Sequence, residues 1–166
     1  RPKFPGLKNV QELMDDPARL YIDLKRVETE LPADFANPRT WEFIAEELQQ
    51  HESVLCIVNS RKDCRELHGL MPKDTIHLSA LMCAQHRSQV IAEIKQRLKD
   101  GIPTRVISTQ LVEAGVDMDF PVVYRALAGL DAIAQAAGRC NREGVLSEMG
   151  KVVVFVPPKP AAPGFL

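Results

Sequence analysis

Short apolar segments alternate with longer segments of helical periodicity along most of this 166-residue chain. Residues 54–58 are apolar without a break, which is typical of a strand buried on both faces of a parallel sheet. Further Val- and Ile-rich runs predict strands at 75–78, 105–108, 122–125 and 152–156. Apolar residues at helical spacing predict helices at 37–48, 60–70, 84–99 and 132–141. This alternation predicts an α/β fold with a parallel central sheet and helices on both faces.

Capping residues mark the expected ends of these helices. Asn37-Pro38 predicts a helix start, with a side-chain acceptor followed by proline at the first helical position. Ser60 and Asp131 are expected to cap two further helices. Gly101, with Pro103 shortly after it, predicts the end of the helix at 84–99.

Residues 37–156 form the predicted domain, and the segments on either side differ from it in composition. Residues 1–36 are expected to be a connector with one edge strand at 20–27, followed by Pro32. Residues 157–166 hold four prolines and predict an extended or disordered tail. The chain starts at Arg1 rather than Met, so we expect a piece excised from a longer protein.

Composition narrows the possible functions only slightly. Apolar residues make up 45% and charged residues 26% of the chain, and the net charge is −1. Such a chain has no overall basic field, so any nucleic acid must bind along a local patch. No apolar run approaches the roughly 18 residues of a membrane span, and no signal peptide is evident. We therefore expect a protein of the cytoplasm.

The four cysteines, which lack any CxxC spacing, are interpreted as free cytosolic thiols. Cys64 with His68, and Cys83 with His86, are the only arrangement that suggests zinc ligands. Their spacing is poor and their separation long, so no metal site is expected.

The most specific chemistry lies in the segment that precedes the last predicted strand. Gln135, Arg139 and Arg142 are spaced at i, i+4 and i+7 and would share one face of a helix. Gly138 beside them permits close approach of another surface. Two guanidiniums a turn apart suit a polyphosphate and can stabilise the charge of phosphoryl transfer. The alternative is a solvated basic helix end that pairs with Glu143 or with Glu148.

Two motifs in order strengthen the first interpretation. Ser-Thr-Gln-x-x-Glu-x-Gly-x-Asp at 108–117 and Gln-x-x-Gly-Arg-x-x-Arg at 135–142 resemble motifs five and six of superfamily two helicases. Supporting stretches lie at 57–60, 77–87 and 127–131. The similarity spans about residues 50–156 and is greatest to the helicase-nuclease of type I CRISPR interference, called Cas-three. It implies the second RecA-like lobe of a helicase, a three-layer α/β sandwich.

The resemblance also implies roles for individual residues. Arg139 and Arg142 would reach the γ-phosphate of ATP, with Gln135 beside them. Asp117 would contact the ribose and Gly115 would form the turn. The residues implied to contact single-stranded DNA, or to couple that contact to the nucleotide, are Thr109, Gln110, Glu113, Asn59, Ser60 and Ser79. The alternative is that Thr109 and Ser79 only cap turns and that Asp117 only satisfies loop amides.

The chain lacks two parts that such an enzyme needs. There is no GxxxxGK[ST] loop to cradle phosphates and no DExD/H box to hold Mg²⁺. We therefore expect ATP and Mg²⁺ to be held mainly by a first RecA-like lobe, and the fragment alone to be inactive as an ATPase. Expected partners are that lobe, single-stranded DNA and a CRISPR surveillance complex. The alternatives are a lobe of another superfamily two DNA or RNA remodelling ATPase, and a non-catalytic interaction domain of the same fold.

Overall fold

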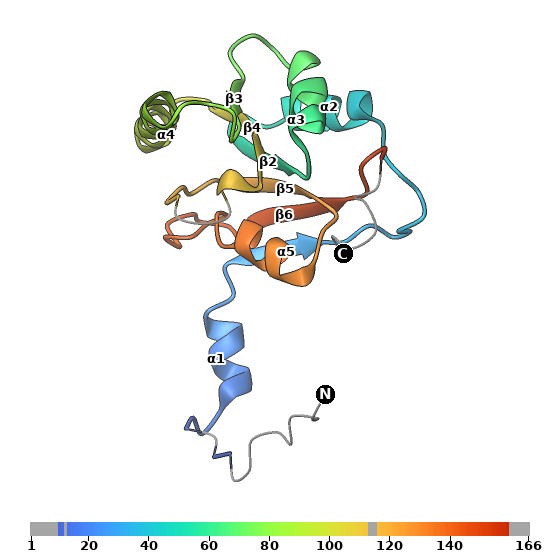
Figure 1. The fold of residues 1–166 in the computed structure, drawn as a ribbon. Helices are drawn as coiled ribbons and strands as arrows, with labels where there is room; N and C mark the ends of the chain where they lie inside the picture. Colours follow the sequence, from blue (N-terminus) through green and yellow to red (C-terminus); the bar gives the residue numbers. More distant parts are fainter. Residues whose placement is uncertain (1–9, 12, 113–115, 160–166) are drawn as a thin grey trace, which may run out of the picture.

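The computed structural model describes residues 10–159 except 12 and 113–115. In this part of the chain, six strands form one parallel sheet in the order β1-β6-β5-β2-β4-β3 (Figure 1). The strands are β1 Val27–Glu30, β2 Val54–Val58, β3 Ile76–Leu78, β4 Arg105–Thr109, β5 Val122–Ala126 and β6 Gly150–Phe155. The uninterrupted apolar run predicted a buried central strand, and β2 is indeed buried along its whole length.

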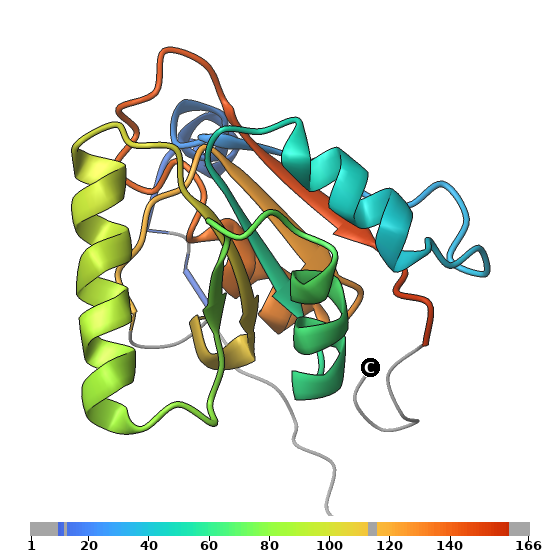
Figure 2. The same cartoon turned by 90° about the horizontal axis from the view of Figure 1, so that it is seen from above.

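Helices cover both faces of the sheet, as the alternating pattern predicts. The helical segments are α1 Pro17–Asp23, α2 Trp41–Gln49, α3 Arg61–Gly69, α4 Ala84–Lys99, the 3₁₀ turn η1 Gln110–Val112 and α5 Leu130–Ala137. The apolar sides of α2 and α3 pack with one face of the sheet, whereas those of α4 and α5 pack with the other. Figure 2 shows α4 on the opposite side of the sheet from α2 and α3. The parallel three-layer α/β prediction is therefore confirmed.

The strand predicted at 20–27 is wrong. Residues 17–23 form α1 instead, because the Asp16 carboxylate accepts a hydrogen bond from the Arg19 amide at 3.0 Å and Pro17 occupies the first helical position. The edge strand begins only at Val27. Figure 1 shows α1 lying away from the sheet, and none of its residues is buried.

Two other predicted helix starts are displaced. Helix α2 begins at Trp41 rather than near Asn37, because the Thr40 hydroxyl accepts the capping hydrogen bond from Phe43 N at 3.3 Å. Gly129, not Asp131, occupies the N-cap of α5, and Asp131 lies in its first turn. The Ser60 cap is confirmed by a 3.1 Å hydrogen bond from Asp63 N.

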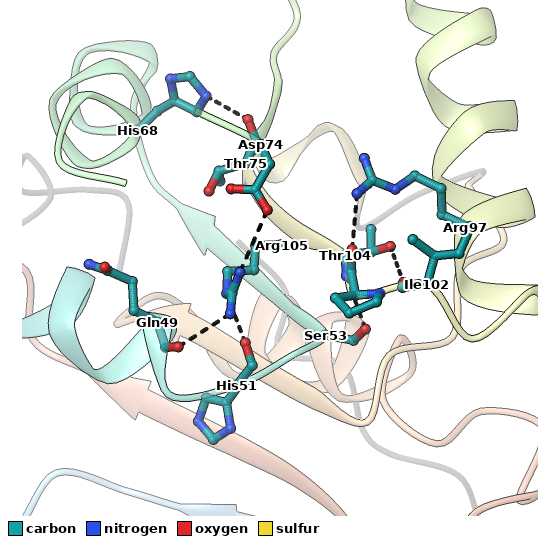
Figure 3. Close-up of polar contacts among 11 residues, drawn as sticks. Gln49, His51, Ser53, His68, Asp74, Thr75, Arg97, Ile102, Thr104 and Arg105 are labelled. Carbon is teal, nitrogen blue, oxygen red and sulfur yellow. Dashed lines mark hydrogen bonds and ion pairs between the residues drawn. The ribbon is translucent and has the colours of Figure 1, made fainter. Parts of the chain in front are cut away.

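Arg105 joins the loops that precede β2 and β3 (Figure 3). Its Nε donates to the carbonyl of His51 at 2.8 Å, and its Nη1 lies 3.8 Å from Asp74 Oδ2. Thr104 N donates to Ser53 Oγ at 3.2 Å beside this cluster. These contacts hold together the segments that lead into β2, β3 and β4.

Among the described residues, no helix combines the length and the apolar character that a membrane span requires.

Candidate functional site

The residues that the motifs assign to nucleic acid gather at the carboxyl ends of three adjacent strands. Asn59 and Ser60 follow β2, Ser79 follows β3, and Thr109 ends β4 with Gln110 after it. The parallel pairing aligns Val58 with Thr109 and Leu78 with Ser108, so these ends form one edge of the sheet. Ligands of open parallel sheets bind at this edge.

The side chains of Asn59 and Ser60 make hydrogen bonds within the domain. Asn59 Nδ2 donates to the Leu127 carbonyl at 2.8 Å, and Asn59 Oδ1 accepts from Nη1 of the fully buried Arg125 at 2.7 Å. Ser60 Oγ is occupied as the cap of α3. These contacts fix the turn after β2 against the end of β5. Sequence reasoning did not single out Arg125, whose place in an apolar strand offered no functional signal.

The remaining residues of this edge differ in how far their side chains are exposed to solvent. Ser79 is 2% exposed and Thr109 8% exposed, whereas Gln110 is exposed. Directly before Thr109 and Ser79, Ser108 Oγ donates to the Leu78 carbonyl at 3.0 Å and so joins β4 to β3. Among the described residues of the predicted set, Gln110 is therefore the exposed one, whereas Asn59 and Ser60 are half-buried.

The segment with the arginines differs from its prediction. Helix α5 ends at Ala137, and Gly138 follows it as the C-cap residue. Arg139 then lies in a turn, and Arg142 follows Asn141, whose φ of 43° is left-handed. The predicted shared helix face is wrong, because the helix stops before the first arginine. Gln135 is exposed on α5 itself.

A short bridge places the arginines at the other edge of the sheet. Phe120 N donates to the Arg139 carbonyl at 2.9 Å, and Asn141 N donates to the Phe120 carbonyl at 3.0 Å. Phe120 precedes β5 by two residues, so this segment lies beside the amino end of β5. Arg139 and Arg142 thus lie toward the opposite edge of the sheet from Thr109 and Gln110.

Three of the candidates for nucleotide contact lie together there. Arg142 Nη1 lies 2.7 Å from Asp117 Oδ1, and the two side chains are 44% and 62% exposed. Arg139 is 9% exposed and its Nε donates to the Val112 carbonyl at 2.9 Å. Burial lowers the pKa of Arg139, and the charge of Arg142 lowers it further, against an opposite effect of Asp117. Glu113 and Gly115 lie outside the described residues.

The structure adds two residues that sequence reasoning missed. Asp119 accepts hydrogen bonds from the backbone N–H groups of Arg142 at 2.7 Å and Glu143 at 3.1 Å. Arg26 Nη1 donates to the Arg142 carbonyl at 2.5 Å. Asp119 stands only two residues after Asp117, which was a usable signal. Nothing in the sequence pointed to Arg26, which is 116 residues away from its partner.

An open hollow of about 630 Å³ adjoins this cluster. The segment at 117–121 lines it together with Glu143, Leu146 and the last turns of α4, where Lys95 and Lys99 lie. Its lining combines both signs of charge with the apolar Phe120 and Leu146. Among the described residues, no group of three or more His, Cys, Asp or Glu side chains is placed to hold a metal ion.

Comparisons with known proteins agree with the motif order. A family model described as CRISPR-associated nuclease/helicase Cas3, C-terminal, matches residues 50–145. The CRISPR-associated nuclease/helicase Cas3 of Haloferax volcanii is 36% identical over 115 residues. That alignment covers 64% of this chain but only 12% of the relative, so the chain spans about an eighth of its length.

Two solved structures share the fold. The T. fusca Cas3-ATP structure matches with a TM-score of 0.64 and 22% identity, over 85% of this chain and 19% of that one. The structure of the Mycobacterium smegmatis helicase Lhr bound to ssDNA and AMP-PNP matches with a TM-score of 0.59 and 20% identity, over 80% and 20%. At these identities the likeness establishes a RecA-like fold. Because the family model matches more than half of the residues, the chain belongs to the Cas3 family and corresponds to its C-terminal helicase lobe.

Proposed function

We propose that this chain is the second motor lobe of an ATP-dependent single-stranded DNA translocase, a helicase of CRISPR interference. It supplies Arg139 and Arg142 to a nucleotide site that a first RecA-like lobe completes. The single observation that carries the proposal is the cluster of the exposed Arg142 and Asp117 with the buried Arg139, in a chain that has no phosphate-cradling loop. The partner of the assembled protein is a CRISPR surveillance complex, because a chain with the same fold (TM-score 0.62) belongs to a solved CRISPR RNA-guided surveillance complex in a pre-nicking state.

The ion pair between Arg142 and Asp117 is compatible with a role for Arg142 in phosphate binding. Both side chains are more than a third exposed, and such pairs contribute only about 0.2–1 kcal/mol. A triphosphate offers more negative charge and several acceptor oxygens to the guanidinium fork. Arg142 can therefore leave Asp117 when the nucleotide arrives. The buried contact of Arg139 with Val112 holds the second guanidinium in a fixed position.

The residues present suit ATP in their chemistry. The positive charges of Arg139 and Arg142 would balance the negative charge of the phosphates. Gln135 would lie near these arginines, and Asp117 would contact the ribose. When bound, ATP supplies the phosphoanhydride bond whose cleavage powers translocation. Glu113 and Gly115 belong to the same proposal through their motif. Mg²⁺ belongs with the first lobe, since the described residues offer no carboxylate set for it.

The carboxyl edge of the sheet is the proposed DNA track. Gln110 is exposed there, so its side chain would meet a DNA strand that crosses this edge, and Thr109, which is 8% exposed, lies directly before it. Asn59 and Ser60 hold the turn after β2 through internal hydrogen bonds, and Ser79 is buried directly after the end of β3. We assign these three residues to the shape of the track. The Lhr structure, which was solved with ssDNA and AMP-PNP, has the same fold in this lobe.

ATP hydrolysis tests the nucleotide proposal. The isolated chain is expected to release no phosphate from ATP, with or without single-stranded DNA, because it cannot hold the β- and γ-phosphates alone. In the full-length protein, Arg142→Ala is expected to lower the rate about 10³- to 10⁵-fold, as for a lost arginine finger. Arg65→Ala, at an exposed arginine on the other face of the sheet, is the control and keeps the rate. Robust turnover by the isolated chain, or a wild-type rate in Arg142→Ala, contradicts the proposal.

DNA stimulation tests the track separately. Thr109→Ala and Gln110→Ala in the full-length protein are expected to weaken binding of a labelled oligo(dT) about tenfold, the effect of one lost hydrogen bond to a charged group. The DNA concentration for half-maximal ATPase stimulation rises in parallel, while KM for ATP changes little. Fluorescence anisotropy and phosphate release measure the two effects. Gln89→Ala, at an exposed position of α4, is the control. An unchanged DNA dependence in both variants removes these residues from the track.

A further inference from the structure

The peptide unit of Arg142 is held by charged side chains on both sides. The two carboxylate oxygens of Asp119 accept from the N–H groups of Arg142 and Glu143, at 2.7 and 3.1 Å. On the other side, the Arg26 guanidinium donates to the Arg142 carbonyl at 2.5 Å. Hydrogen bonds with an ionised partner are roughly twice as strong as neutral ones. Asp119 and Arg26 therefore form a clamp on the backbone of Arg142.

The residue before Arg142 needs this support. Asn141 has a φ of 43°, a conformation that is uncommon for residues other than glycine and tolerated best by Asn and Asp. Asn141 Nδ2 donates to the Arg26 carbonyl at 3.0 Å, and Asn141 Oδ1 accepts from Leu146 N at 3.4 Å. Gly144, at φ +67°, leaves room for the Arg26 side chain, whose Nε would lie 3.3 Å from an added Cβ. The turn that contains Arg142 therefore contacts Arg26 at both ends, through Asn141 before Arg142 and through Gly144 after it.

No helix orients Arg142, because α5 ends five residues earlier at Ala137. Its guanidinium meets the exposed Asp117 carboxylate, a contact too weak to fix a long side chain. The segment at 117–119 therefore faces Arg142 twice, with Asp117 at the guanidinium and Asp119 at the backbone. The clamp supplies the orientation that the missing helical turn would otherwise give.

We propose that Asp119 and Arg26 are positioning residues for Arg142. They hold its backbone so that the guanidinium stays beside Asp117, ready to meet a phosphate delivered by the first lobe. The inference rests on the proposed role of Arg142 in ATP hydrolysis. It adds a link from the connector before β1, which carries Arg26, to the residue that completes the nucleotide site.

Asp119→Asn in the full-length protein tests the carboxylate half of the clamp. The amide keeps the shape but offers one acceptor and places an NH₂ group against an N–H donor. We expect kcat for ATP to fall about 10- to 100-fold, from the loss of charged hydrogen bonds, while KM for ATP and DNA binding change less than threefold. Combined with Arg142→Ala, Asp119→Asn should cause no further loss of kcat. A merely structural role predicts an added loss and a matching fall in Tm.

Arg26 provides a second test that does not depend on the stability of Asp119→Asn. Arg26→Ala should lower kcat by a similar factor, and Arg26→Lys should recover part of it, because lysine keeps a charged donor for the Arg142 carbonyl. Lys25→Ala, at the exposed neighbouring position, is the matched control and keeps the wild-type kcat.

The outcomes separate this inference from the proposed function. If Arg142→Ala hydrolyses ATP at the wild-type rate, both fail. If Arg142→Ala is inactive while Asp119→Asn and Arg26→Ala keep the wild-type kcat, only the clamp is refuted. Losses that add to that of Arg142→Ala also refute it, since a clamp has no effect once the residue it positions is gone.

Discussion

Gly150, the first residue of β6, is where the turn that leads into Arg142 packs against the sheet. A Cβ atom at this position would lie 2.6 Å from Cys140 Sγ and 2.8 Å from Asn141 Cβ. Both neighbours are buried and belong to the turn that leads into Arg142. Cys140 Sγ also lies 3.4 Å from the Pro121 carbonyl and 3.5 Å from the Lys151 carbonyl, so it has little room to move.

We therefore expect Gly150→Ala to lower the free energy of unfolding by about 1–3 kcal/mol, the usual cost of overpacking. The matched control is Gly69→Ala at the end of α3, where an added Cβ meets no atom within 4 Å. That substitution should be neutral or stabilise by up to about 1 kcal/mol, through the entropy of the unfolded chain. Urea unfolding followed by circular dichroism measures both. Equal midpoints for the two variants would show that the turn yields to the methyl group.

The sequence pointed to some residues of the candidate site and gave no signal for others. Arg139 and Arg142 were singled out by their charge and spacing, which can be read from the sequence, and Asp117 was singled out through the motif resemblance. Asp119 and Arg26 were missed, because their hydrogen bonds go to backbone atoms, which every residue possesses. Asn59 shows the opposite case, a residue that the sequence pointed to but whose side chain has an internal role. It is polar and follows a strand, yet its hydrogen bonds go to Leu127 and Arg125 of the domain itself.

At the scale of elements, continuous burial was the most dependable signal. The apolar runs that predicted β2, β4, β5 and β6 lie within one or two residues of the observed strands, and α4 has the predicted bounds. The positions of these segments are determined by the burial of their apolar residues, and the spacing of those residues can be read directly from the sequence.

Errors arose where local capping competes with periodicity. The alternation at 20–27 suggested a strand, but Asp16 and Pro17 start a helix there. The arginine spacing suggested a helix to residue 141, but α5 ends before Gly138, a frequent stop residue. Two arginines at i and i+3 resemble a helix face whether or not the helix continues. The structure decides against the helix, which ends at Ala137, before either arginine and before the left-handed Asn141.

Across the whole molecule, the segment between β4 and β5 connects the two proposed sites. It starts at the carboxyl edge with Thr109 and Gln110 and reaches the amino edge with Asp117 and Asp119. A change at the DNA track therefore has a short covalent route to the partners of Arg142. Val112 belongs to the same segment and holds Arg139 through its carbonyl. This placement supports the proposed coupling of DNA binding to ATP hydrolysis.

The response of the fold to acid follows from two partly buried histidines. The pKa of His51 is lowered by burial first, then by Lys151, against an opposite effect of Glu47. The pKa of His77 is lowered by burial and then by His68 and Arg65. His77 Nε2 is buried and has no hydrogen-bond partner within the described residues. Both side chains therefore resist protonation in the folded chain more than in the unfolded chain.

A histidine whose pKa falls on folding stabilises the fold above its unfolded pKa of 6.5 and loses that contribution as the pH drops through the folded value. We expect the unfolding free energy to decline below pH 6.5, by at most about 1.4 kcal/mol per pH unit for each histidine. His77→Gln should flatten this decline, whereas His86→Gln, at an exposed position of α4, should leave it unchanged. Urea unfolding of the three chains at pH 7.5, 6.5 and 5.5 measures the slopes. Parallel slopes for the wild type and His77→Gln would show that His77 does not resist protonation in the fold.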